Sequence, residues 1–290
     1  MSRRTSQQSA AAEPIGHAHS GALRSARRLS TLKGRRAAEQ FLAEGPQAVR
    51  EAVAAGLVQR LFVTPAASVR HADIVADGHA SGATVLEVGE AELASLTDTV
   101  TPQGLVAVCG IDTASLAEVV AARPKLVVVC AQVRDPGNAG TVIRCADAFG
   151  ADAVVLTEGS VDVHNPKTVR ATAGSLFHLP VVTDVSLVEA TDALKAAGLR
   201  VLAADGSGTK TLLDLTAELS GPVAWVMGNE AWGLPAEDLA TADIVAKVPM
   251  WGAAESLNLS TAAAVCLYAT AAAQHASTPA IEMPAAAPSS

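Results

Sequence analysis

The stretch DPGNAGTVIR, residues 135–144, lies between a segment typical of a buried strand and one typical of a helix. Residues 126–130 form a short, mostly β-branched apolar run, which predicts a strand covered on both faces. From residue 139 to 149 apolar side chains recur at helical spacing. Turns between a strand and a helix are where α/β proteins place ligand-binding groups. We expect Asn138 to cap the helix and Arg144 to lie nearly two turns into it; the alternative is an ordinary capped turn with one exposed arginine.

Length and composition exclude several classes of protein. The chain has 290 residues, of which 50% are hydrophobic and 17% charged, so we expect about two domains that each bury a core. It has no apolar run near the roughly 20 residues of a membrane span and no secretory leader, which predicts a cytoplasmic protein without a membrane partner. The four cysteines show no C-x-x-C spacing and the seven histidines no metal-ligand spacing. We therefore predict buried, reduced thiols and no metal centre.

The order of segments predicts two α/β domains. We expect a disordered arm at residues 1–24, an N-terminal domain at 25–112, a linker at 113–123, a second domain at 124–276 and a disordered tail at 277–290. In the second domain strands alternate with helices, which predicts a parallel sheet covered on both faces. In the first, apolar residues at 37, 38, 41 and 42 predict one helix that ends at Gly45.

Basic residues gather near the N-terminus although the net charge of the chain is −8. Arg28, Arg35 and Arg36 belong to a cluster of six basic residues between 24 and 36. The cluster is either a solvated basic arm or a local patch that binds the phosphates of RNA. Arg170, on a helix predicted after Asn165 and Pro166, has the same two interpretations.

Two later segments also place polar residues directly after a predicted strand. In VMGNEAWGL, residues 226–234, Gly228 allows close approach of a ligand or a second backbone, and Asn229 and Glu230 are expected to point into a crevice. In residues 248–261 a strand ends at Pro249, and Ser256 and Asn258 are more cap residues than one helix needs. The surplus indicates hydrogen bonds to a ligand. GSGTKT, residues 206–211, lacks the ending of a phosphate-binding P-loop, and no G-x-G-x-x-G follows a predicted strand.

Together the three stretches resemble a known enzyme family. N-x-G-x-x-x-R at 138–144, MGNE-x-x-GL at 227–234, and VPM at 248–250 with SLNLS at 256–260 are similar, in order and spacing, to the three motifs of the SpoU (TrmH-type) RNA ribose 2′-O-methyltransferases of the SPOUT superfamily. The resemblance covers residues 123–275, and residues 36–63 resemble the ribosomal-protein-like RNA-binding domain that precedes the catalytic domain in several members.

The resemblance implies a fold, a cofactor and partners. The fold is a SPOUT-type parallel sheet with a C-terminal trefoil knot, after a small α/β RNA-binding domain, in an obligate homodimer. The cofactor is S-adenosylmethionine, held bent in the knotted loops, with Trp251 lining its pocket. The residues implied to hold it are Met227, Gly228, Val248, Met250 and Leu257.

The resemblance also implies catalytic roles. It assigns activation of the ribose 2′-hydroxyl to Arg144, and because a free guanidinium stays charged at neutral pH, we expect an orienting donor that stabilises alkoxide charge. A general-base arginine remains the alternative if the dimer interface favours its neutral form. Asn138 would position Arg144 or the ribose, and Glu230 would pair with an arginine across the dimer. Ser256 and Asn258 would fix the loop and meet the hydroxyl.

The expected substrate is 23S ribosomal RNA, by the resemblance to the ribosomal-RNA methyltransferases. Two alternatives stay open. One is a tRNA substrate, and the other is a non-catalytic RNA-binding or ribosome-assembly protein on the same fold.

Overall fold

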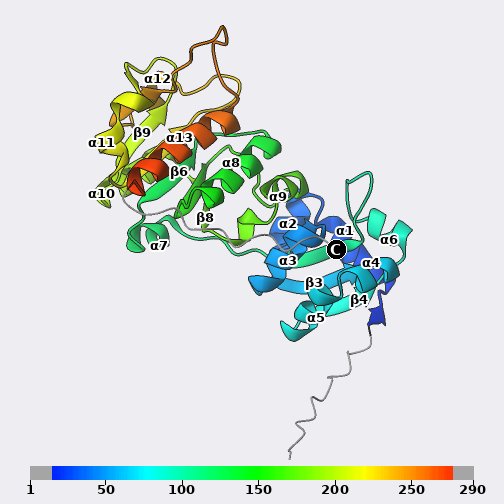
Figure 1. Cartoon of the computed structure of the whole chain (residues 1–290). Coiled ribbons are helices and arrows are strands. Elements are labelled where there is room, and N and C mark those ends of the chain that lie inside the picture. Colours follow the sequence, from blue (N-terminus) through cyan, green and yellow to red (C-terminus); the bar gives the residue numbers. More distant parts are fainter. Residues whose placement is uncertain (1–14, 277–290) are drawn as a thin grey trace, which may run out of the picture. The chain divides into compact units, whose positions relative to one another are not determined.

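The computed structural model of the chain describes residues 15–276, and these fall into two compact units (Figure 1). The N-terminal unit holds the residues up to Asp112 together with His164–Arg170. The C-terminal unit holds Thr113–Val163 and the residues from Ala171 onward.

The N-terminal unit is built on a five-stranded mixed sheet. Its strand order is β1-β4-β3-β5-β2, in which β5 runs antiparallel to both β2 and β3. The strands are β1 (Gly16–His17), β2 (Gln40–Glu44), β3 (Val58–Val63), β4 (Thr84–Glu87) and β5 (Leu105–Gly110). The helices are α1 (Ser20–Arg28), α2 (Leu32–Ala38), α3 (Pro46–Ala54), α4 (Pro65–Arg70), α5 (Ala72–Ala80) and α6 (Glu90–Ala94).

The C-terminal unit carries a seven-stranded sheet of order β10-β12-β9-β11-β6-β7-β8, and all its strand pairs are parallel. The strands are β6 (Leu126–Cys130), β7 (Ala153–Thr157), β8 (Val181–Val185), β9 (Arg200–Ala204), β10 (Lys210–Thr211), β11 (Val223–Met227) and β12 (Ile244–Lys247). The helices are α7 (Leu116–Ala121), α8 (Pro136–Ala148), α10 (Leu187–Ala196), α11 (Thr216–Leu219), α12 (Ala236–Leu239) and α13 (Leu259–Gln274), with short 3₁₀ turns η1 (Ser175–Phe177) and η2 (Leu212–Asp214). Helix α9 (Pro166–Thr172) belongs to the N-terminal unit up to Arg170 and to the C-terminal unit from Ala171.

Helices cover both faces of the C-terminal sheet, which confirms the predicted layered α/β architecture. On one face α8 and α13 pack against each other and supply Ile143 and Leu267 to a large apolar core (Figure 1). On the other face α7 and α10 supply Val119 and Leu194 to a second core. Strands β6 and β11 lie between the two cores and are buried along their whole length, as their continuous apolar sequences require. The trefoil knot is not tested by strand order and stays a prediction.

Three expectations about local structure were wrong. The predicted disordered arm, residues 1–24, overlaps β1 and the first half of α1; its residues 1–14 lie outside the described residues, as does the tail from 277. The predicted linker contains α7, whose Leu116 and Val119 belong to a core. The helix predicted through residue 42 ends at Ala38, because Glu39 adopts a left-handed conformation with φ of 51° and the chain then enters β2.

The four cysteines are free, and three of them are fully enclosed. Burial raises the pKa of the Cys109 and Cys266 thiols to about 12. Cys145 is half-buried. Thiols this hard to ionise behave as small apolar side chains, as predicted. No helix within residues 15–276 has the length and hydropathy that crossing a bilayer requires.

A buried side-chain hydrogen bond ties α13 to the centre of the sheet. Trp225 of β11 donates from Nε1 to Thr270 Oγ1 at 2.9 Å, and both residues are completely buried. We expect Thr270→Val to lower the free energy of unfolding by about 1–3 kcal/mol, because the indole N–H would lose its acceptor in a dry environment. Urea denaturation would measure this. Thr270→Ser keeps the hydroxyl and should lose less, so equal losses in the two variants would contradict the role of this hydrogen bond.

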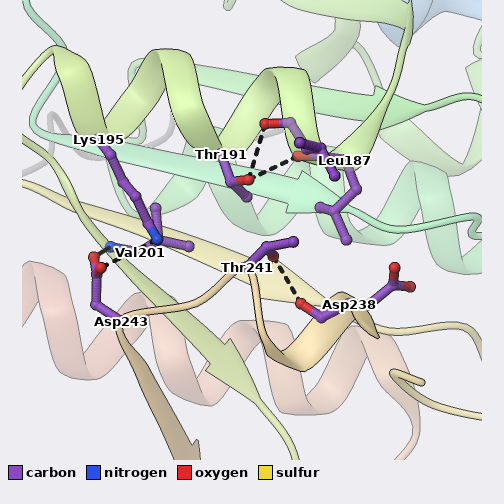
Figure 2. Close-up of polar contacts among 8 residues, drawn as sticks. Leu187, Thr191, Lys195, Val201, Asp238, Thr241 and Asp243 are labelled. Atoms are coloured by element: carbon purple, nitrogen blue, oxygen red, sulfur yellow. Dashed lines mark hydrogen bonds and ion pairs between the residues drawn. The ribbon is translucent and has the colours of Figure 1, made fainter. Parts of the chain in front are cut away.

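The segment that leads into β12 is held by one carboxylate (Figure 2). Asp243 accepts the backbone N–H of Val201 at 2.8 Å through Oδ2, and its Oδ1 lies 3.2 Å from the ammonium of Lys195 on α10. The backbone N–H of Asp243 donates in turn to the carbonyl of Val201 at 2.8 Å. These contacts fix β12 beside β9, so the loop after β12 leaves from the same edge of the sheet as the loops after β9 and β11.

Candidate functional site

The first motif forms the N-terminus of α8, with one difference from the prediction. Asp135, not Asn138, is the N-cap: its Oδ1 accepts the backbone N–H of Asn138 at 2.8 Å, and Pro136 takes the first helical position. A proline there has no N–H to satisfy and already has helical φ, so the cap falls one residue before it. Asn138 therefore lies inside the first turn, and its side-chain amide is free for tertiary contacts.

The second motif is a tight loop closed on itself after β11. Asn229 and Gly233 exchange two backbone hydrogen bonds of 2.9 Å. The Asn229 side chain is buried, donates to the carbonyl of Gln132 at 2.5 Å and accepts the N–H of Ala231 at 2.8 Å. At Gly228 an added Cβ would lie 2.6 Å from the backbone carbon of Gly233, so a second backbone does make the close approach that the glycine permits.

The closed loop carries Glu230 to the start of α8. Its carboxylate accepts the backbone N–H groups of Arg134 and Asp135 at 3.4 and 3.3 Å. A negative charge is stabilised here by the positive end of the helix dipole. Burial and the Glu230 charge together raise the pKa of Cys130, at the end of β6, to about 12.

The third motif closes the site through Asn258, which caps α13. Its Oδ1 accepts the backbone N–H of Ser260 at 2.9 Å and the Ser260 hydroxyl at 2.7 Å. Its Nδ2 donates to Asn138 Oδ1 at 3.1 Å, and Asn138 Nδ2 donates to Glu230 Oε1 at 3.2 Å. A chain of hydrogen bonds, Glu230–Asn138–Asn258, thus joins three motifs that are about 30 to 120 residues apart in the sequence.

The loops of the second and third motifs, together with the loop after β9, surround a cleft of about 440 Å³ at the carboxyl edge of the sheet. The first motif does not contribute to this lining, and Asn138 joins it to the other two through hydrogen bonds. Eight of the predicted catalytic and cofactor-binding residues line the cleft: Met227, Gly228, Glu230, Val248, Met250, Ser256, Leu257 and Asn258. Asn229, expected in a crevice, lines it as well. The volume lies in the range of small-molecule sites, and parallel sheets place such sites at this edge.

Sequence reasoning missed part of the cleft wall. Asp205, Gly206, Lys247 and Glu255 also line the cleft. Asp205 directly follows β9 and Lys247 ends β12, so position at the carboxyl end of a predicted strand was the available signal. Trp251 was expected in this lining, but it is 85% exposed and lies outside it.

Arg144 is placed differently from the other expected catalytic residues. It is exposed on α8 and forms no hydrogen bond or ion pair with any residue between 15 and 276. Six residues of helix put it about 9 Å along the axis from Asn138 and roughly 120° around it. Neither Arg144 nor Asn138 lines the cleft of its own chain.

The four predicted RNA-binding arginines differ in exposure and in their partners. Arg28 and Arg36 are exposed on α1 and α2. Arg35 is 2% exposed and donates to the carbonyls of Leu29 and Ser30 at 2.9 and 3.0 Å, so its prediction as an RNA contact was wrong. Arg170 is half-buried, and its guanidinium pairs with Glu44 at 3.2 Å within the N-terminal unit.

Asn258→Ala tests the hydrogen-bond chain. We expect a loss of about 0.5–2 kcal/mol in the free energy of unfolding, because α13 loses its N-cap and Asn138 loses a donor. Thermal or urea denaturation would measure it. Asn258→Asp keeps the capping oxygen and removes the donor to Asn138, so an unchanged stability in both variants would contradict these contacts.

Comparison with known proteins places the chain in a family. Residues 125–268 match the model of the SpoU rRNA Methylase family, and residues 22–107 match the MRM3-like substrate binding domain. The 23S rRNA (guanosine(2553)-2′-O)-methyltransferase RlmP of Bacillus subtilis (strain 168) is 36% identical over 243 residues, which are 83% of this chain and 92% of that protein.

Solved structures agree over both units. An AdoMet-bound rRNA methyltransferase from Sinorhizobium meliloti has a TM-score of 0.77 at 32% identity and covers 88% of this chain and 96% of that one. The SpoU methyltransferase AviRb from Streptomyces viridochromogenes, in complex with the cofactor AdoMet, has a TM-score of 0.75 at 27% identity over 86% of this chain and 96% of that one. The chain belongs to the SpoU rRNA methylase family, within the SPOUT superfamily.

Proposed function

We propose that this protein transfers a methyl group from S-adenosylmethionine to a ribose 2′-hydroxyl of 23S ribosomal RNA. The observation that carries the proposal is that the second and third motifs line one cleft and are joined to the first motif by the hydrogen-bond chain Glu230–Asn138–Asn258. The printed activity of the B. subtilis relative and the cofactor bound in two similar structures support the same chemistry.

The cleft suits this cofactor in size and charge. Apolar walls from Met227, Val248 and Leu257 can contact an adenine ring, while backbone groups at the strand ends offer donors and acceptors. Asp205, Glu230 and Glu255 place three carboxylates in the lining against the one ammonium of Lys247. An excess of negative charge favours a ligand that carries a positive sulfonium. When bound, the cofactor supplies a methyl group that is already activated for in-line displacement.

The protein's own residues then orient the ribose and stabilise the negative charge that develops on its 2′ oxygen. Asn138 is held from both sides, by Glu230 and Asn258, so its position is fixed before RNA binds. We propose that it positions the ribose, and that Ser256 and Asn258 hold the third loop where it meets the hydroxyl. Pre-positioned groups of this kind lower the barrier because reorganisation is complete before reaction.

In this mechanism Arg144 acts from a second chain. It is exposed and does not line the cleft of its own chain, so we propose that it enters the site of a second copy in a homodimer. There it would donate to the developing alkoxide, with Glu230 as the carboxylate that orients it. A phosphate of the RNA or a side chain would then receive the proton.

We propose that the N-terminal unit binds the RNA. The match to a substrate binding domain supports it, as does the exposed basic surface of α1 and α2 that includes Arg28 and Arg36. Arg170 pairs with Glu44 through one guanidinium nitrogen, which leaves further N–H donors that could contact phosphate. A ribosomal substrate also implies a cytoplasmic location.

Two measurements test the function. Titration calorimetry should show S-adenosylmethionine binding to the purified protein, and tritiated cofactor should label an unmodified 23S rRNA transcript. Cofactor binding without label in any RNA would favour the non-catalytic alternative. Label in tRNA but not in 23S rRNA would favour the tRNA alternative.

A further inference from the structure

The loop after β11 presents an exposed tryptophan beside the proposed site. Trp232 is 48% exposed, although it lies between Glu230 and Gly233, which both line the cleft. Tryptophan is enriched at interfaces, because its ring offers a large apolar face and its N–H a polar one. Trp232 makes no part of either apolar core of the C-terminal unit.

The position of this indole is fixed. The two backbone hydrogen bonds between Asn229 and Gly233 enclose only three residues, and Ala231 is tied to the Asn229 side chain. The guanidinium carbon of Arg134 lies 4.9 Å from the centre of the Trp232 ring. Arg134 is itself anchored, because its backbone N–H donates to Glu230. The cation covers one face of the ring and holds it, while nearly half of the residue stays accessible.

We propose that Trp232 is the stacking platform for the base of the nucleotide whose ribose is methylated, and that Arg134 is the positioning residue behind it. The inference rests on the proposed function. A ribose at Asn138 and Glu230 carries its base within the same nucleotide, and Glu230 is only two residues from Trp232. RNA-binding proteins receive unpaired bases by stacking them on aromatic rings, and a neighbouring arginine adds attraction for phosphate.

Stacking tolerates any base, because every base has a π face. The platform would therefore supply affinity for an extruded nucleotide without choosing among the four bases. Selection of the site would come from other contacts, such as those of the N-terminal unit.

The test compares Trp232→Leu, which keeps apolar bulk but removes the ring, with Trp232→Phe, which keeps an aromatic face. With unmodified 23S rRNA transcript as substrate, we expect KM for RNA to rise roughly tenfold in Trp232→Leu and kcat to stay within about twofold. Trp232→Phe should recover most of the affinity, and calorimetry should show normal S-adenosylmethionine binding in both. A KM in Trp232→Leu equal to wild type, or an equal loss in Trp232→Phe, would overturn the platform.

A comparison of two RNA substrates tests whether Trp232 stacks on the base of the methylated nucleotide. An RNA oligonucleotide that carries the methylated site, and the same oligonucleotide with an abasic ribose there, should differ in KM for wild type and scarcely for Trp232→Leu. If Trp232→Leu weakens both RNAs equally, the ring does not stack on that base. If the wild type itself transfers no methyl group to RNA, the proposed function fails and the inference fails with it; loss confined to the variants leaves the function intact.

Discussion

Replacement of Arg144 by alanine should lower the rate of methyl transfer by a factor of roughly 10²–10³ or more while S-adenosylmethionine still binds. The reason is positional: Arg144 is exposed on α8, outside the cofactor cleft, so its loss removes no contact from the proposed cofactor site. Its loss does remove the donor proposed to stabilise charge on the ribose oxygen. Transfer of tritiated methyl groups to 23S rRNA and calorimetry with the cofactor measure the two effects separately.

A matched control is available for this variant. Arg200 is also exposed, but it lies at the start of β9, at the edge of the sheet opposite the cleft. Arg200→Ala should keep normal turnover. Arg144→Lys tests geometry, because lysine keeps the charge and loses the planar fork, and it should remain strongly impaired. Turnover in Arg144→Ala within a few fold of wild type would remove this residue from the mechanism.

Gly228→Ala is expected to weaken S-adenosylmethionine binding by roughly 10- to 100-fold. The new Cβ would lie 2.6 and 2.8 Å from the backbone carbon and oxygen of Gly233, and 2.9 Å from Leu234 Cγ. Backbone atoms closed by the Asn229–Gly233 hydrogen bonds cannot yield without opening the loop. The loop would shift in the wall of the cleft, and Glu230 would shift with it.

The control for this variant is Gly221→Ala, just before β11. There the nearest atom to an added Cβ is Glu218 O at 3.7 Å, an ordinary contact. Calorimetry should find cofactor affinity unchanged in Gly221→Ala, and circular dichroism should show that both variants are folded. Gly228→Ala with a dissociation constant within twofold of wild type would contradict the assigned role of this loop.

Periodicity and strand-end polarity were enough to predict the C-terminal architecture. The continuous apolar runs of β6 and β11 require burial on both faces, and the polar loops that follow them meet at one edge because parallel strands end there. The convergence of Glu230, Asn138 and Asn258 followed from this geometry.

Details that depend on tertiary contacts could not be predicted in this way. A basic cluster gives no sign that Arg35 turns inward to the carbonyls at the end of α1, since its neighbours in sequence have the same charge. The apolar pattern around Phe41 is compatible with a helix or a strand, and the segment forms a strand because it pairs with β5. Asp135, and not Asn138, is the N-cap of α8, because Pro136 favours the first helical position and so fixes where the helix begins.

The central claim is that the three loops form a site that methylates a ribose of 23S rRNA. Mapping of 2′-O-methyl groups by their resistance to alkaline hydrolysis, in total RNA from cells with and without the gene, tests it most directly. We expect that a ribose in 23S rRNA loses its methyl group without the gene, and regains it with the wild-type gene but not with Arg144→Ala. An identical methylation pattern in both cells, or a change confined to tRNA, would contradict it.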